Sequence, residues 1–220
     1  MAKLLIFDWD GTLSNSLDRI AHAMRWAADD AGMRVPEVKE VHEIVGLGLN
    51  EAVAKLFPGI GIDEIQALRE RYSKEYFRID EQTADFYPGV METLQALKAD
   101  GYLLAVATGK SRRGLNRVLE SKCVADFFDD SRCADETASK PDPLMLNELI
   151  ARFGLQPDEA IMVGDTEYDM AMAQAAAMPR IGVSYGAHAA QRLHNYDPLG
   201  CVDHFPQVAE LVAEYSASLR

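Results

Sequence analysis

The sequence predicts an α/β fold, with a parallel sheet flanked by helices and a block of helices inserted after the first strand. Three features of the 220 residues support this fold. Short apolar runs alternate with longer amphipathic segments, which is the pattern of α/β units. Each run stops at polar or small residues. Residues 16–86, between the first two runs, show helical periodicity instead.

Four apolar runs are predicted to form strands. They cover residues 3–7, 102–107, 160–163 and 180–183. Their apolar residues are consecutive rather than alternating, as in strands that helices cover on both faces. Ligands of open parallel sheets bind beyond the carboxyl ends of the strands. The polar residues that follow these runs are therefore expected to gather at one edge.

The helices between the strands have recognisable ends. Pro88 opens a helix that Gly101 ends, and Ser111 is placed to cap the helix after the second strand. Two more helices are predicted over residues 142–154 and 165–177. Each of these helices follows or precedes an apolar run, as α/β units require.

The inserted block is predicted to be a helical bundle. An apolar stripe that begins with Leu17 and Ile20 predicts a first helix, which ends at Gly32. Further helices are expected from Pro36, over 50–57 and over 63–79. The block is too long for a crossover, so we interpret it as a lid above the carboxyl edge of the sheet. The predicted domains are a core of residues 1–15 and 87–220 and a cap of residues 16–86.

Charge and composition narrow the class of protein. The 35 acidic and 22 basic residues give a formal net charge of −13, which argues against partners such as nucleic acid or anionic membranes. No apolar run approaches the ~20 residues of a membrane span. The three cysteines lack disulfide or zinc spacing, and no signal-peptide pattern precedes Asp8, so a cytoplasmic protein is expected. Nothing in the sequence indicates its oligomeric state.

Two acidic pairs follow predicted strands. Asp8 and Asp10 come directly after the first run, and Asp165 and Asp169 follow the third. One carboxylate can act as a covalent nucleophile while a neighbour transfers the proton. Buried acids this close need a metal or a cation to compensate them. Each pair alone also fits a structural role, in which the acids end a strand or, at Asp165, cap a helix.

Two further clusters have the chemistry of anion binding. Thr108 and Gly109 offer a hydroxyl and free backbone N–H groups at the entry of a helix. Lys140 lies in a proline-rich turn at another helix start, where its ammonium group could face an anion. Taken singly, these clusters are more often a simple capped turn and a solvated lysine.

In combination the four clusters have a specific order: D-x-D-G-T, T-G, K-P and G-D-x-x-x-D, each at a strand end. This order resembles the haloacid dehalogenase-like superfamily of aspartate-nucleophile phosphatases, over the whole chain. The sequence FDWDGTL and residues 45–49 and 163–176 make it most similar to the phosphoglycolate phosphatase-like branch. The resemblance implies a Rossmann-like core with an inserted helical-bundle cap domain.

The resemblance also implies a two-step hydrolysis of a phosphate monoester. Asp8 would attack phosphorus and form an aspartyl-phosphate. Asp10 would protonate the leaving group and then activate water. Mg²⁺ is the implied cofactor, and oxygen ligands suit it. Its ligands would be Asp8, the Asp10 carbonyl and Asp165, with Asp169 as a further ligand or support.

Four residues are implied in binding the phosphoryl group. Thr108, the Gly109 N–H group and Lys140 would hold its oxygens, and Thr12 would brace the substrate-binding loop. Thr108 and Lys140 would thereby take part in catalysis, because phosphoryl transfer depends mainly on positioning and charge neutralisation. The predicted substrate is a small phosphorylated metabolite, with phosphoglycolate as one candidate by analogy.

Other activities remain open at this point. The alternatives are a β-phosphoglucomutase-like enzyme, a pyrophosphatase, a nucleotidase or a non-catalytic phosphate-binding relative. Asp10 favours phosphoryl transfer over carbon–halogen cleavage, because the dehalogenase branch lacks this second acid. Two positions depart from the family pattern. Asn15 stands where many relatives have aspartate, and Ala177 stands where glycine is common, so another turn geometry is expected there.

Overall fold

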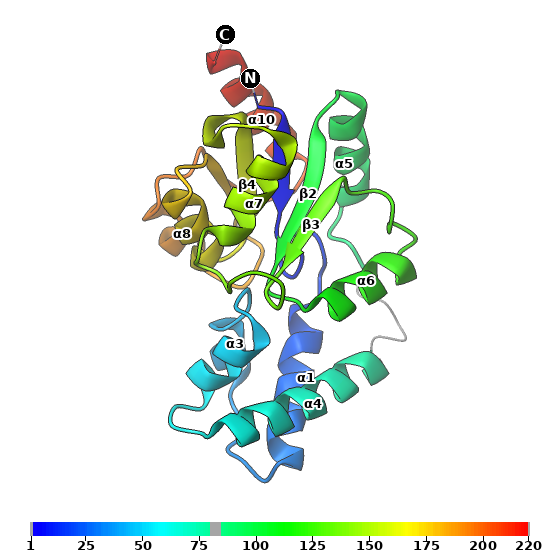
Figure 1. Ribbon diagram of the computed structural model, residues 1–220, viewed down its shortest axis with the longest axis vertical. Coiled ribbons are helices and arrows are strands. Elements are labelled where there is room, and N and C mark those ends of the chain that lie inside the picture. The colour runs from blue at the N-terminus through cyan, green and yellow to red at the C-terminus, as the bar shows by residue number, and fades with distance from the viewer. Residues whose placement is uncertain (1, 80–84, 220) are drawn as a thin grey trace.

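The computed structural model describes residues 2–79 and 85–219. Its ribbon has two parts: a sheet with helices around it, and a group of helices below the sheet (Figure 1). The lower group includes α1 (Leu17–Asp30), α3 (Leu49–Leu56) and α4 (Ile62–Ile79). Within the described residues, no helix is both long enough and apolar enough to cross a membrane.

The sheet has six strands in the order β3-β2-β1-β4-β5-β6, and every neighbouring pair is parallel. Four strands lie where the apolar runs predict them, to within one residue at each end. The strands are β1 (Leu4–Phe7), β2 (Leu103–Thr108), β3 (Asp130–Cys133), β4 (Ala160–Gly164), β5 (Arg180–Val183) and β6 (Cys201–Val202). The sequence prediction misses β3 and β6, the two edge strands, because neither carries an apolar run.

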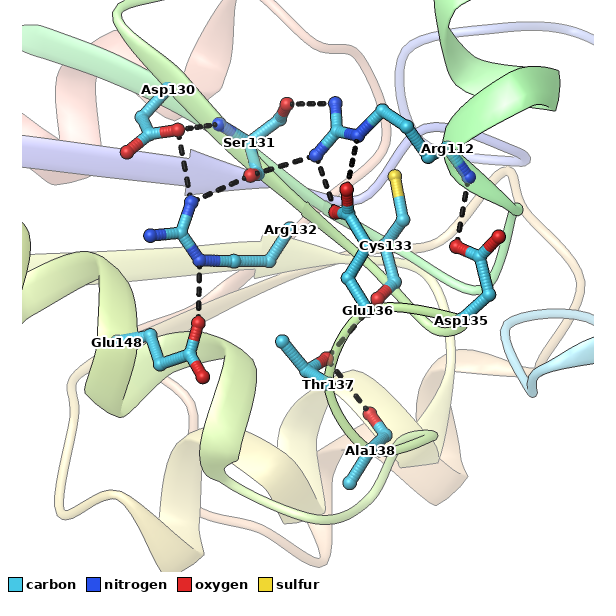
Figure 2. Close-up of polar contacts among 10 residues, drawn as sticks. All are labelled: Arg112, Asp130, Ser131, Arg132, Cys133, Asp135, Glu136, Thr137, Ala138 and Glu148. Atoms are coloured by element: carbon cyan, nitrogen blue, oxygen red, sulfur yellow. Dashed lines mark hydrogen bonds and ion pairs between the residues drawn. The ribbon is translucent and has the colours of Figure 1, made fainter.

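The edge strand β3 is polar, and side chains cover part of its backbone. The guanidinium groups of Arg112 and Arg132 both donate to the Ser131 carbonyl, at 3.0 and 2.8 Å (Figure 2). Arg112 also pairs with Glu136, and Arg132 with Glu148, at 2.6 and 2.7 Å. An edge strand occupied by charged groups is a poor template for pairing with another chain.

Helices cover both faces of the sheet. Leu5 and Phe7 of β1 pack with α5, α6 and α10, whereas Leu4 and Ile6 pack with α7 and α8. This two-sided burial explains why the central strands are continuously apolar. The core helices are α5 (Val90–Ala99), α6 (Arg112–Ser121), α7 (Leu144–Phe153), α8 (Glu167–Ala175), α9 (Ala190–His194) and α10 (Gln207–Ser218), with a 3₁₀ turn η1 (Pro157–Glu159).

The inserted helices have a hydrophobic core of their own. The four helices are α1 (Leu17–Asp30), α2 (Val38–His42), α3 (Leu49–Leu56) and α4 (Ile62–Ile79). Ile20 and Met24 of α1 and Leu68 and Tyr76 of α4 belong to one buried cluster, distinct from those of the sheet. The parallel sheet with an inserted helical bundle confirms the predicted fold class. The boundaries at 16 and 86 stay a prediction, and residues 80–84 lie outside the described residues.

The helix ends test the capping predictions. Ser111 caps α6, since its Oγ accepts a hydrogen bond from the Gly114 N–H group. Gly154 ends α7 with φ of 65°. The structural reading of Asp165 as a helix cap is wrong, because Thr166 caps α8 instead. The carboxylate of Asp165 is thereby left for other partners.

Candidate active site

Asp8 and Asp10 lie just beyond the carboxyl end of β1, and both line the same cavity. Trp9, between them, points away and packs against Phe86 and Phe128. The next residue, Gly11, has φ of 82°. A Cβ there would lie 2.2 Å from Asp165 Oδ2, so only glycine allows the turn to pass this close to the second acidic pair.

Lys140 is buried between two carboxylates. Its Nζ lies 2.8 Å from Asp8 Oδ1 and 2.6 Å from Asp169 Oδ1. Neither oxygen of Asp8 accepts a hydrogen bond of good geometry from the described residues, although both are buried. Burial raises the pKa of Asp8, an effect that Lys140 opposes and the charges of Asp169 and Asp165 increase. Asp8 is therefore a buried carboxylate with acceptor capacity to spare.

Asp165 and Asp169 are held by fixed donors. Asp165 accepts the Thr12 hydroxyl and the Ala187 N–H group, both at 2.7 Å. Asp169 Oδ2 accepts the Thr166 hydroxyl at 2.6 Å, besides the contact of its Oδ1 with Lys140. Burial, followed by the charge of Asp169, raises the pKa of Asp165 to about 7.

These acids form a cluster with the chemistry of a metal site. One oxygen each of Asp8, Asp165 and Asp169 lies within 4.8 Å of the others, and all three residues are buried. Carboxylate oxygens at this spacing suit a hard divalent cation. The unsatisfied oxygens of Asp8 make the cluster fit a cation better than a closed hydrogen-bond network.

Asp10 has a different set of partners. Its Oδ1 accepts the Ser16 hydroxyl at 2.6 Å, and its Oδ2 lies 2.9 Å from Lys110 Nζ. The same ammonium group lies over the ring of Tyr76 in α4, 4.7 Å from its centroid. The sequence analysis did not single out Lys110. Its position directly after Thr108-Gly109 could have indicated from the sequence that Lys110 lies at the site.

The turn after β2 meets the inserted helices. Thr108 Oγ1 accepts the backbone N–H group of Lys110 at 3.2 Å. A Cβ on Gly109 would lie 2.4 Å from the Leu47 carbonyl and 2.6 Å from the Gly46 carbonyl. The insert therefore closes directly onto this turn.

A cavity of about 190 Å³ lies at this junction. Asp8, Asp10, Thr108 and Gly109 line its core side, while α1, α3 and α4 line the other. Thr12, Lys140, Asp165 and Asp169 are buried behind the lining residues. The structure thus brings all eight predicted site residues to one edge of the sheet, in two layers.

Other contacts fix the insert against the core. The Gly48 N–H group donates to Ser139 Oγ at 2.7 Å, and the Tyr168 hydroxyl donates to the Glu43 carbonyl at 2.7 Å. Within the core, the Tyr185 hydroxyl donates to the Thr12 carbonyl at 2.9 Å and supports the turn after β1.

The fold and the acidic site define a Rossmann-like hydrolase with a helical cap. The family described as haloacid dehalogenase-like hydrolase matches residues 5–183. The chain belongs to this family.

Relatives of known name agree with this assignment. The chain is 34% identical to the "Probable phosphatase IndB" of Dickeya dadantii over 94% of this chain and 92% of that protein. It is 31% identical to a phosphoglycolate phosphatase of Vibrio vulnificus over 96% of both chains. A predicted phosphoglycolate phosphatase from Haemophilus somnus has a similar structure, with a TM-score of 0.87, 27% identity and coverage of 96% of this chain and 98% of that one. The protein is a phosphatase of the haloacid dehalogenase-like family.

Proposed function

We propose that this phosphatase hydrolyses a small phosphorylated metabolite, in a Mg²⁺-dependent reaction that passes through an aspartyl-phosphate on Asp8. The proposal rests on the position and the hydrogen bonding of Asp8. Asp8 lines the cavity, and neither of its oxygens is committed to a protein hydrogen bond of good geometry. Phosphoglycolate is the first substrate to test, because relatives about as long as this chain are named for it.

The first step forms a bond between an Asp8 oxygen and phosphorus and breaks the bond from phosphorus to the ester oxygen. The leaving oxygen takes a proton from Asp10 and departs as an alcohol. In the second step Asp10 accepts a proton from water while the water oxygen attacks phosphorus. Asp8 is then released as a carboxylate, together with inorganic phosphate. Lys110 and Ser16 hold Asp10 for both transfers.

The remaining residues bind and orient. Lys140 offsets the negative charge that gathers around Asp8, while the Thr108 hydroxyl and the Gly109 N–H group bind phosphoryl oxygens. Thr12 lies behind the residues that line the cavity, and its hydroxyl donates to Asp165. We therefore propose Thr12 as a positioning residue.

The donor set fits Mg²⁺. Asp8, Asp165 and Asp169 offer clustered carboxylate oxygens, and the Asp10 carbonyl is the further ligand that we propose. Bound there, the ion would neutralise phosphoryl charge. Asp169 already accepts from Lys140 and Thr166, so its main role is to hold Lys140.

The alternatives differ in product. Likeness to a β-phosphoglucomutase of Clostridium difficile, at 19% identity and a TM-score of 0.86, shows the shared fold alone. A pyrophosphatase and a nucleotidase would differ from the proposed enzyme in the compound that releases phosphate. A non-catalytic relative would release none. A cytoplasmic location and the absence of a nucleic-acid partner remain predictions from composition.

The decisive experiment measures phosphate release from a panel of small esters, pyrophosphate and nucleotides, with Mg²⁺ and with EDTA. We expect release that requires both Mg²⁺ and Asp8. Asp8→Asn keeps the side-chain volume and removes the nucleophile, so it should lower kcat by at least about 10³-fold and leave the melting temperature within a few degrees. Undiminished turnover by Asp8→Asn would refute the aspartyl-phosphate mechanism, and an isomerised sugar phosphate without phosphate release would favour a mutase.

A further inference from the structure

The cap side of the cavity carries an unpaired cation. One face of α4 supplies five lining residues at helical spacing: Arg69, Tyr72, Ser73, Tyr76 and Phe77. These side chains lie across the cavity from Asp8 and the Thr108 turn, because both groups line the same space. A molecule whose phosphate reaches Asp8 therefore has α4 on its other side.

No described residue pairs with the charge of Arg69. Its Nε atom is buried without a hydrogen bond, and none of the ion pairs of the described residues involves Arg69. A guanidinium group stays protonated in proteins, so burial of an unpaired Nε–H group has a cost that an anion would remove. Glu51 and Asp135 also line the cavity, but no hydrogen bond or ion pair of the described residues joins either of them to Arg69.

The other cations of this region are already committed. Lys110 lies 2.9 Å from Asp10, and Lys140 lies between Asp8 and Asp169. Arg71, two residues along α4, pairs with Asp30 at 3.0 Å. Arg69 thus differs from these neighbours, because it lines the cavity and its buried Nε atom has no acceptor among the described residues.

We propose that Arg69 is the binding site for a carboxylate at the end of the substrate remote from the phosphate ester. The planar guanidinium fork matches the two oxygens of a carboxylate. Phosphate at the core side and carboxylate at the cap side would fix both ends of a short molecule. The inference rests on the proposed function, and it restricts the substrate class to phosphorylated hydroxy acids.

The test pairs two substrates that differ in one group: 2-phosphoglycolate and its carboxamide analogue. Wild type should prefer the carboxylate, and Arg69→Met should lower kcat/KM for 2-phosphoglycolate by about 30- to 100-fold, which is the worth of a charge-assisted hydrogen bond or two. Turnover of the carboxamide should change less than about threefold, which also shows that the variant is folded. Arg69→Lys keeps the charge but loses the planar guanidinium group. Its kcat/KM for 2-phosphoglycolate should lie between those of wild type and Arg69→Met. Arg71→Met removes the same charge from another face of α4 and should leave both substrates unchanged.

The outcomes separate the two proposals. Arg69→Met could lower kcat/KM equally for both substrates, or the preference for the carboxylate could survive the substitution. Either result would refute the carboxylate site and would leave the phosphatase mechanism unaffected. If neither ester is hydrolysed, calorimetry on Asp8→Asn with and without Arg69→Met decides the site. Weaker binding of 2-phosphoglycolate, with unchanged binding of the carboxamide, supports it, and equal affinities refute it.

Discussion

At the scale of single residues, the site depends on buried polar groups that act through one another. Thr12 does not line the cavity, but its hydroxyl is one of two donors to the buried Asp165. A carboxylate that loses such a donor keeps its desolvation cost and becomes free to rotate. The residues behind the cavity should therefore be nearly as sensitive to substitution as those that line it.

Thr12→Val tests this dependence. We expect a loss of about 2 kcal/mol in the free energy of unfolding, because Asp165 is left with an unmet acceptor. Mg²⁺ affinity should fall at least about tenfold. Thr12→Ser keeps the hydroxyl and is the matched control. Urea unfolding and calorimetric Mg²⁺ titration measure both quantities, and unchanged Mg²⁺ affinity in Thr12→Val would remove Thr12 from its positioning role.

The pKa of Asp165 gives a pH dependence with a definite sign. Burial and Asp169 raise this pKa from 3.8 to about 7. Between these values the folded state holds a proton that the unfolded state has released, so the stability contribution falls as pH rises. In EDTA, the contribution of Asp165 should therefore make the wild type less stable at pH 8 than at pH 6.

Asp165→Asn isolates the effect. In EDTA at pH 8 the variant should melt at a higher temperature than wild type, and the difference should shrink towards pH 5. With saturating Mg²⁺ the order should reverse, because the ion stabilises only the protein with the full carboxylate set. Thermal melts at three pH values, with and without Mg²⁺, measure this. A variant that is less stable than wild type in EDTA at pH 8 would contradict the assignment.

At the scale of elements, apolar runs predicted the strands that are buried on both faces and failed at the edges. β3 has the sequence DSRC, which is no apolar run, and Arg112 and Arg132 both donate to its Ser131 carbonyl. β6 has two residues and no room for a pattern. Helix ends were predictable where capping is local, as at Ser111, but Thr166 rather than Asp165 caps α8.

The end of α8 also corrects an expectation from sequence. Ala177 has φ of 51°, so the chain keeps the left-handed turn that glycine favours instead of adopting another geometry. Two backbone bonds close the turn, from Met178 N to Ala173 O at 2.8 Å and from Ala177 N to Gln174 O at 3.0 Å. These bonds enforce a conformation that costs alanine about 1 kcal/mol.

Ala177→Gly should therefore stabilise the protein by about 1 kcal/mol, or raise its melting temperature by about 3 °C. Ala175→Gly is the matched control, because Ala175 is exposed within the same helix. That substitution should lower the melting temperature slightly, since Ala175 is the last residue of α8 and glycine is a poorer helix former than alanine. Differential scanning calorimetry compares the three proteins, and a lower melting temperature for Ala177→Gly would show that the turn is not strained.

At the scale of the whole molecule, the core half of the site was predictable and the cap half was not. The acids and Thr108 lie at the ends of predicted strands, and parallel strands bring their carboxyl ends together in any such sheet. Lys140 follows the unpredicted strand β3, so its place in the site was indicated only by the K-P motif. Helical periodicity in the insert identifies the face that packs on other helices, and says nothing of which polar side chains meet the core. Arg69 and the contact of Lys110 with Tyr76 depend on that docking.

One contact between the cap and the core leaves no room for a side chain. The Gly46 and Leu47 carbonyls reach so close to Gly109 that a Cβ there would lie 2.6 and 2.4 Å from them. The obstacle is backbone, so it cannot yield by a side-chain rotation. The cap loop would have to move away from the turn that carries Thr108.

Gly109→Ala should therefore hold the cap partly open and leave the core folded. We expect kcat/KM to fall at least about tenfold through loss of cap closure, with a change of less than ~1 kcal/mol in the free energy of unfolding. Gly61→Ala is the control, because its Cβ would meet only Glu64 Oε2 at 3.5 Å. Steady-state kinetics measure the loss, and small-angle scattering with and without a phosphate analogue measures closure. Full activity of Gly109→Ala would mean that catalysis does not need the cap seated on the Thr108 turn.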